Sequence, residues 1–218
     1  MPQLEKIQAI AIERPFNKGH LIFQEGDTGD GFYIVNTGKI KVFKLSFEGK
    51  EQILHIYGPG HTFGEVPVFE GKNFPASAMT IEDSSILFLP RDKFVNLITT
   101  TPALSMNMLA DLSKRLRAFT IQIENLSLKE VPARLAAYIL TLSQEKKSEL
   151  PGSILKSEPM VTLPISKAQL ANLIGTTPET ISRIFKKMVD AQLIEVKTKD
   201  IFITNMEGLS EISESGRL

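Results

Sequence analysis

Residues 165–185 read ISKAQLANLIGTTPETISRIF, and their pattern predicts two short helices joined by a tight turn. The first helix is expected to begin at Ser166 and to bury apolar residues spaced i, i+3, i+4, namely Leu170, Leu173 and Ile174. Gly175 is typical of the left-handed residue that ends a helix, while Thr177 and Pro178 are typical of an N-cap and a first-turn proline. The turn chemistry therefore predicts a helix-turn-helix.

The second predicted helix has one apolar side and one polar side. The apolar set is Ile181, Ile184, Phe185, Met188 and Val189, and the polar set is Glu179, Ser182, Arg183 and Lys186. A helix in the major groove of DNA presents its first turns to base edges, where Arg can bind guanine and Glu can accept from cytosine. A solvent-exposed i, i+4 pair of Glu179 and Arg183 is the simpler explanation of these two residues taken alone.

The residues after this helix favour the DNA interpretation. Two alternating runs, 193–196 and 200–204, flank Lys197-Thr198-Lys199 and predict a β-hairpin with a basic tip. A hairpin directly after a helix-turn-helix is a wing. We therefore expect a winged helix-turn-helix whose partner is double-stranded DNA.

A long helix is predicted for residues 102–127, before this region. Its apolar residues step alternately by three and four, as in a coiled coil, and form a predicted dimer seam: Leu109, Leu112, Leu116, Phe119, Ile123 and Leu126. An amphipathic helix packed on its own domain would show a similar pattern. Arg115 is expected to be solvent-exposed at the side of this helix. Ser127 and Glu130 have the spacing of a capping box that opens the next helix and marks a hinge.

The N-terminal part of the chain has a different pattern. From Phe16 to about Leu89, short alternating runs are separated by glycine, and this region holds 10 of the 14 glycines. Strands at such intervals predict an antiparallel barrel or jelly roll. Residues 145–159 are polar and rich in turn formers, so they are expected to form an exposed connection.

Composition excludes several mechanisms. The chain has no cysteine, so iron–sulfur clusters, thiol switches and disulfides are excluded. Lys plus Arg equals Asp plus Glu at 25 each, so any DNA affinity must come from local placement of charge. No apolar run approaches a membrane span of about 20 residues and no leader pattern follows Met1, so no membrane partner and a cytoplasmic location are expected.

Three features together resemble the CRP/FNR family of bacterial transcription regulators: Gly64-Glu65, the long helix before Pro132, and the run Glu179 to Arg183. The resemblance covers nearly the whole chain, and residues 123–130 look most like the nitrogen-oxide-responsive DNR-type and HcpR-type branch. It implies an α+β chain with a β-roll (jelly-roll, cyclic-nucleotide-binding-like) sensor domain at 1–101, a dimerisation helix at 102–128 and a winged helix-turn-helix domain at 129–218. It also implies a homodimer, a small-molecule effector and RNA polymerase as a partner.

The resemblance assigns roles to residues of the DNA-binding region. Glu179, Ser182 and Arg183 match family members that read TTGA-like half-sites in a palindrome. Pro178 replaces a residue that touches a base in some members, which leaves the outermost base open. The positions expected to contact DNA phosphates are Ser166, Lys167, Thr177, Thr180, Lys186 and Lys199.

The effector is expected to differ from a cyclic nucleotide. Family members that bind one have a Glu like Glu65, and then an Arg and a Ser or Thr soon after the glycine at Gly71; Phe74 and Pro75 stand there instead. Without a guanidinium, the phosphate would be a buried charge with no partner. A more apolar effector pocket is predicted from Gly64, Glu65, Phe69, Phe74, Phe119 and Thr120.

Haem is one apolar effector that the branch resemblance suggests, with His20, His55 and His61 as candidate axial ligands. For each of them an ordinary histidine is the simpler explanation, because none has a spaced partner. A cupin-like metal enzyme is the alternative from another class, but Phe63 stands where the second metal-binding histidine would be, so no enzyme is expected. A ligand-binding dimer without DNA binding is a third interpretation, and the presence of both Glu179 and Arg183 argues against it.

Overall fold

The computed structural model describes residues 2–149 and 160–218. The chain divides into two compact units, Met1–Leu116 and Arg117–Leu218. Helix α4 (Pro102–Leu128) begins in the first unit and ends in the second. The predicted division of the chain into three parts at 101 and 128 stays a prediction.

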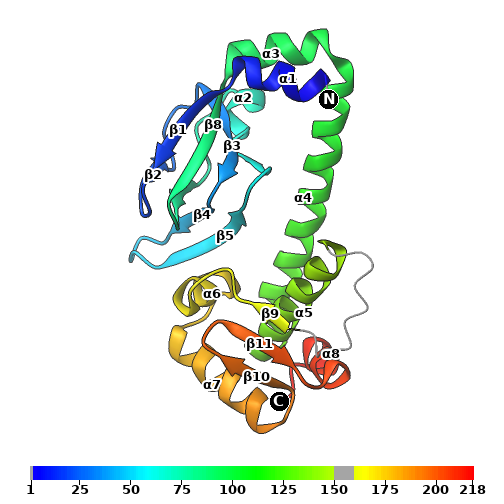
Figure 1. The fold of residues 1–218 in the computed structure, drawn as a ribbon. Helices are drawn as coiled ribbons and strands as arrows, with labels where there is room; N and C mark the ends of the chain where they lie inside the picture. The colour runs from blue at the N-terminus through cyan, green and yellow to red at the C-terminus, as the bar shows by residue number, and fades with distance from the viewer. Residues whose placement is uncertain (1, 150–159) are drawn as a thin grey trace. The chain divides into compact units, whose positions relative to one another are not determined.

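The first unit is the predicted β-roll, built from two antiparallel four-stranded sheets (Figure 1). One sheet has the order β1 (Ile12–Phe16), β8 (Ser84–Pro90), β3 (Gly31–Thr37) and β6 (Thr62–Phe63). The other has the order β2 (Leu21–Phe23), β7 (Ser77–Thr80), β4 (Ile40–Leu45) and β5 (Glu51–Tyr57). Helices α1 (Pro2–Ile10), α2 (Val66–Glu70) and α3 (Arg91–Thr100) complete the unit. The glycine-punctuated strands are thus confirmed.

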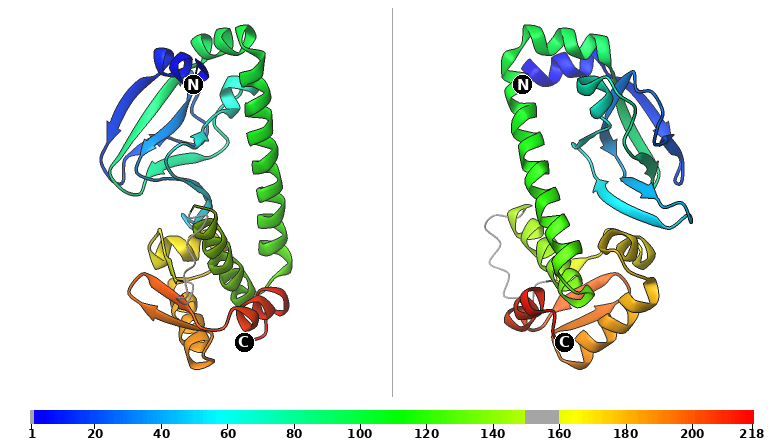
Figure 2. Two further views of the ribbon diagram at one scale, coloured as in Figure 1. Left: turned by 45° about the vertical axis from the view of Figure 1, so that its right-hand side comes forward. Right: turned by 180° about the vertical axis from the view of Figure 1, so that it is seen from behind.

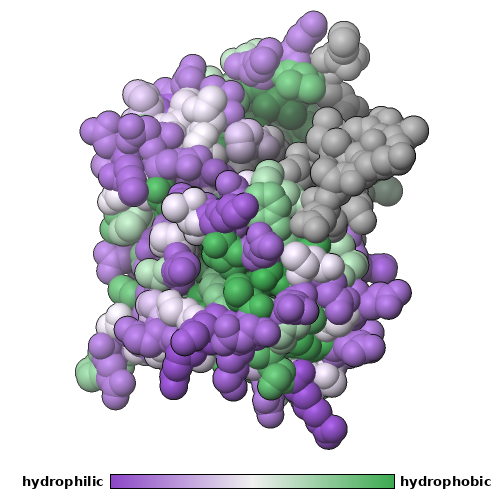
Figure 3. Space-filling view, turned by 60° about the horizontal axis from the view of Figure 1, so that its bottom comes forward, coloured by the Kyte–Doolittle hydropathy of each residue, from purple (hydrophilic) through white to green (hydrophobic). Residues whose placement is uncertain are grey.

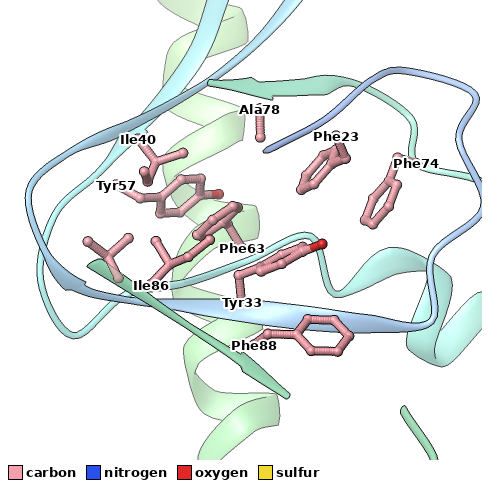
Figure 4. Packing of buried hydrophobic residues seen from close by; sticks show 10 residues of the cluster. Phe23, Tyr33, Ile40, Tyr57, Phe63, Phe74, Ala78, Ile86 and Phe88 are labelled. Carbon is pink, nitrogen blue, oxygen red and sulfur yellow. The ribbon is translucent and has the colours of Figure 1, made fainter. Parts of the chain in front are cut away.

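Aromatic rings fill the core between the two sheets (Figure 4). Phe23 stacks on Phe74 with ring centroids 3.8 Å apart, and Tyr33 and Phe63 continue the group at 5.2 Å. Phe23, Tyr33, Phe63 and Phe74 are each at most 7% exposed. Since each large buried ring removes an apolar area of the order of 150–250 Å² from water, these rings account for much of the stability of the roll.

The second unit is a winged helix-turn-helix, as predicted. Its elements are the end of α4, then α5 (Val131–Glu149), β9 (Met160–Thr162), α6 (Lys167–Ile174), α7 (Pro178–Asp190), β10 (Ile194–Lys197), β11 (Asp200–Ile203) and α8 (Met206–Ser215). The strands form one antiparallel sheet in the order β10-β11-β9. Helices α5 and α8 lie side by side (Figure 2). The α5 residues Leu135, Ala136 and Ile139 are fully buried.

Several local predictions were wrong. Ser127 lies inside α4, so it cannot cap the next helix; Glu130 precedes α5, and its carbonyl accepts from the N–H of Arg134. Helix α5 continues to Glu149, into the predicted connection, whose remaining residues 150–159 lie outside the described part of the chain. Val189, expected to be buried, is 39% exposed, because α7 ends one residue later.

Candidate nucleic-acid interface and effector site

The first helix of the motif, α6, begins with a full capping box. Ser166 Oγ accepts from the N–H of Gln169 at 3.2 Å, and Gln169 Oε1 accepts from the N–H of Ser166 at 2.9 Å. The helix ends at Gly175, whose φ of 71° is left-handed and whose N–H donates to the carbonyl of Ala171. Both ends of α6 are therefore fixed by local hydrogen bonds.

The second helix, α7, is held by one cap and by a buried side. The hydroxyl of Thr177 accepts from the N–H of Thr180, and Pro178 stands in the first turn. Ile181 and Met188 are fully buried, and Phe185 is 4% exposed. This anchoring fixes the direction in which the opposite side of α7 points.

That opposite side is exposed, as predicted for Glu179, Ser182, Arg183 and Lys186. The simpler interpretation was an i, i+4 ion pair of Glu179 with Arg183, but the ion pairs among the described residues do not include it. Arg183 Nη2 instead donates to Thr180 Oγ1 at 3.3 Å. Hydrogen bonds from its own backbone N–H and the Thr177 hydroxyl, helped by the charge of Arg183, hold the pKa of Glu179 below its ordinary value. Glu179 therefore offers a charged acceptor at the start of α7.

The candidate phosphate-contacting residues lie around this helix. Ser166, Lys167, Thr177, Lys186 and Lys199 are exposed, and Thr180 is half-buried. Lys199 belongs to the predicted basic tip between β10 and β11. Figure 3 brings the side that carries α7 and this hairpin forward, and hydrophilic side chains there surround a group of apolar ones. The individual base and phosphate contacts stay predictions.

A partly buried ion network surrounds Glu65 in the first unit. Arg115 on α4 donates to Glu65 Oε1 at 2.8 Å, to Thr62 Oγ1 at 2.5 Å and to Asp111 Oδ2 at 2.7 Å. The side chains of Glu65 and Arg115 are each 13% exposed. The expectation that Arg115 would be solvent-exposed was therefore wrong, because the roll supplies a carboxylate that pairs with it.

Burial shifts the pKa values of this neighbourhood. It raises the pKa of Glu65 despite the opposing charge of Arg115, and it raises the pKa of Tyr57 to about 12. The pKa of His55 falls to about 4, first because of burial and then because of the charges of Arg115 and His61. The guanidinium of Arg115 also lies 5.3 Å from the Tyr57 ring centroid. His55 is therefore neutral at neutral pH.

The residues of the predicted effector pocket differ in their burial and in the unit to which they belong. Phe74 is 4% exposed and belongs to the aromatic core, whereas Phe69 on α2 is 50% exposed. Gly64 has a left-handed φ of 73°, and a Cβ there would meet the ring of Phe23 at 3.0 Å. Phe119 and Thr120 belong to the second unit. The grouping of these residues into one pocket stays a prediction.

The three histidines lie in separate segments of the first unit, His55 in a strand and the other two in loops. His20 is exposed, and its ring centroid lies 4.6 Å from that of Phe16. His55 lies in β5 with its ring centroid 4.5 Å from that of Tyr57, and His61 is exposed with Nδ1 3.1 Å from the carbonyl of Gly58. Within the described residues, no three side chains of the metal-binding types gather at one point. The histidines therefore do not form a shared ligand set.

Comparisons with known proteins agree with this architecture. Residues 13–101 match the family model of the cyclic nucleotide-binding domain, and residues 133–212 match that of the Crp-like helix-turn-helix domain. None of the helices described here carries an apolar stretch long enough for a membrane crossing.

The relatives include two bacterial regulators. The chain is 30% identical over 195 residues to the CRP-like cAMP-activated global transcriptional regulator of Mycobacterium tuberculosis, covering 89% of this chain and 85% of the relative. It is 30% identical over 200 residues to the cyclic AMP receptor protein of Thermus thermophilus, covering 92% and 87%. A mutant of CooA from Carboxydothermus hydrogenoformans has the same fold, with a TM-score of 0.81, 22% identity and coverage of 98% and 91%. That the relatives are regulators supports a non-enzymatic role. With its β-roll, its exposed α7 surface and these relatives, the chain belongs to the CRP/FNR family of DNA-binding transcription regulators.

Proposed function

We propose that the chain acts as a homodimer that reads the two halves of a TTGA-like palindrome under the control of a small-molecule effector other than a cyclic nucleotide. The observation that carries the DNA part is the exposed side of α7, where Glu179, Ser182 and Arg183 stand in the first two turns. These are the turns that meet base edges when a recognition helix enters the major groove.

The exposed apolar residues of α4 support the dimer. Leu109, Leu116 and Ile123, seven residues apart, are 57%, 69% and 65% exposed. Single exposed leucines are common on monomers, but a row at heptad spacing is the pattern that a second helix covers in a coiled coil. A twofold axis along α4 would also relate two recognition helices, as a palindrome requires.

A pair of glutamate substitutions tests the dimer. Leu116→Glu places a charge in the dimer seam, whereas Lys114→Glu places one on another side of the same exposed helix. Sedimentation of the first variant should show monomers at micromolar concentration, and the second should remain dimeric. Equal masses for the two variants and the wild-type chain would contradict the seam.

Two further variants test the reading of DNA. Arg183→Ala should weaken binding to a TTGA palindrome by about 1 to 3 kcal/mol and relax the preference at one guanine. Lys167→Ala should weaken binding to all sequences alike, because a phosphate contact carries no base information. Titrations against specific and scrambled duplexes separate the two roles, and equal losses on both duplexes for both variants would refute the division.

Two observations argue against a cyclic nucleotide, although the relative from M. tuberculosis is described as cAMP-activated. Phe74, at the place of the expected arginine, is stacked on Phe23 in the core and offers no charge. Arg115, beside Glu65, is already paired with both Glu65 and Asp111, so a phosphate arriving there would meet two carboxylates. Millimolar cAMP should therefore leave the DNA affinity unchanged, and tight calorimetric binding of cAMP would overturn this part.

Haem is a specific candidate for the effector, with nitric oxide as its signal. This candidate comes from the likeness of residues 123–130 to the DNR-type and HcpR-type branch. His55 is the candidate ligand that we choose for the test, because burial keeps its imidazole neutral and an imidazole that ligates iron is neutral. The described residues otherwise form no shared set of ligands. Reconstitution with haem should give a strong Soret band that His55→Gln removes; a flat visible spectrum would end the haem proposal.

A further inference from the structure

Arg134 connects two helices of the DNA-binding unit that are far apart in the sequence. It stands in the first turn of α5, where its own N–H donates to the carbonyl of Glu130 at 3.1 Å. Its guanidinium Nη1 donates to the carbonyl of Ile174, the last residue of α6, at 2.6 Å. The side chain thus bridges the start of α5 to the end of the first helix of the helix-turn-helix.

The carbonyl that Arg134 contacts lies directly before the turn. The N–H groups of Gly175 and Thr176 both donate to the carbonyl of Ala171, so they fold the chain back over the last turn of α6. The carbonyls at the C-terminal end of a helix lack partners within the helix and carry partial negative charge. A guanidinium is well suited to such a carbonyl because it is a charged donor with fixed geometry.

Placing the guanidinium of Arg134 at this position costs free energy in two ways. Burial lowers the pKa of Arg134, which reflects unfavourable desolvation of its charge. Among the described side chains, its Nε is a buried donor without an acceptor. An apolar side chain of similar length would avoid both penalties. The hydrogen bond to the Ile174 carbonyl is a feature of this side chain that an apolar replacement would not reproduce.

We propose that Arg134 is a positioning residue for DNA recognition. By holding the carbonyl of Ile174, it fixes the end of α6 relative to α5 and so sets the turn at 175–177 that directs α7. This role of Arg134 rests on the proposed reading of bases by α7, but it requires neither a particular effector, nor a particular operator sequence, nor the dimer seam. A small error in the direction of α7 displaces Glu179 and Arg183 from base edges, while contacts to phosphates tolerate it better, so specific binding should suffer more than non-specific binding.

Arg134→Met and Arg134→Lys form the matched pair for a test. Methionine keeps an unbranched apolar stem but has no donor, whereas lysine can still donate one hydrogen bond to the Ile174 carbonyl. Arg217→Met removes one positive charge from an exposed position of the same unit and serves as the charge control. The DNA is a duplex selected by the wild-type protein from a random library, compared with its scrambled version.

Arg134→Met should bind the selected duplex about tenfold more weakly, because binding must then restore the direction of α7 without a charge-assisted hydrogen bond that is worth about that factor. It should bind the scrambled duplex no more than about twofold more weakly. Arg134→Lys should recover most of the loss, and Arg217→Met should show none of it. Amide exchange of Gly175 and Thr176 should accelerate in Arg134→Met and return in Arg134→Lys, which tests the contact without DNA. Wild-type affinity of Arg134→Met, equal losses on both duplexes, or unchanged exchange at the turn would each overturn the proposal.

Discussion

His55 makes the stability of the β-roll depend on pH in a way that can be calculated. The residue lies in β5 opposite Val42, with its ring 4.5 Å from that of Tyr57. The charged groups that act on it are Arg115 and His61, and with burial they lower its pKa from 6.5 to about 4. Between these two values the unfolded chain binds a proton at this residue and the folded chain does not. Acid therefore favours the unfolded chain.

The sign and size follow from proton linkage. The pKa of His55 is lower in the folded chain than in the unfolded chain. The free energy of unfolding therefore has its full value above pH 6.5 and decreases as the pH falls towards 4. A shift of that size corresponds to a total loss of about 3 kcal/mol, of which about 2 kcal/mol falls between pH 7 and pH 5. Other groups titrate in the same range, so the quantity to measure is the difference between two chains.

We therefore expect His55→Gln to be less sensitive to acid than the wild-type chain. Urea unfolding at one fixed protein concentration, at pH 7, 6 and 5, gives the free energy of unfolding of each chain. The wild-type value should fall by about 2 kcal/mol more than that of His55→Gln across this range. His20→Gln is the control, because His20 is exposed, and it should follow the wild-type chain. Parallel pH dependence of His55→Gln and wild type would refute the reasoning.

Three further predictions concern stability. Phe74→Ala should lower the free energy of unfolding by about 3 to 5 kcal/mol, because it removes a stacked core ring; a loss below 1 kcal/mol in urea unfolding would show that the ring is dispensable. Ser166→Ala should cost about 1 kcal/mol through loss of the capping box, measured as a lower midpoint, and an unchanged midpoint would contradict the cap. Gly38→Ala should cost more than Gly49→Ala by at least about 1 kcal/mol: both have left-handed φ, but only at Gly38 would a Cβ meet Ser84 Oγ, at 2.2 Å, so equal losses would contradict the close approach.

The winged helix-turn-helix was predictable from the sequence because its signals are local. Gly175, Thr177 and Pro178 determine the turn through their own backbone preferences, and all three were placed correctly. The exposure of Glu179 and Arg183 followed from helix periodicity alone. In contrast, β9 was missed, because its three residues form a strand only by pairing with β11, and a run of that length gives no alternation to recognise.

The surroundings of Glu65 were not predictable in the same way. Glu65 and Arg115 are 50 residues apart and meet because the long side chain of Arg115 reaches from α4 to the roll within the first unit, a contact that no periodic pattern encodes. Arg115 also stands next to Leu116, a predicted seam residue. Neighbouring residues of a helix point in different directions, so the periodic pattern placed Arg115 on the solvent-exposed side. Arg115 can be largely buried because the carboxylate of Glu65 pairs with it. A guanidinium buried to that extent without a partner would be strongly unfavourable.

The same reasoning explains why the effector is harder to infer than the DNA site. Recognition of DNA by α7 uses side chains that point into solvent, and their chemistry can be taken directly from their identity. At Glu65, the family resemblance suggested a carboxylate like that of members that bind a cyclic nucleotide, but its Oε1 already accepts a hydrogen bond from Arg115. An effector that displaces Arg115 from this carboxylate must replace a largely buried, charge-assisted hydrogen bond, and it must leave Arg115 with Asp111 or with a new acceptor of its own. The chemistry of such an effector is therefore constrained by the Glu65–Arg115 hydrogen bond that it breaks as much as by the contacts that it makes.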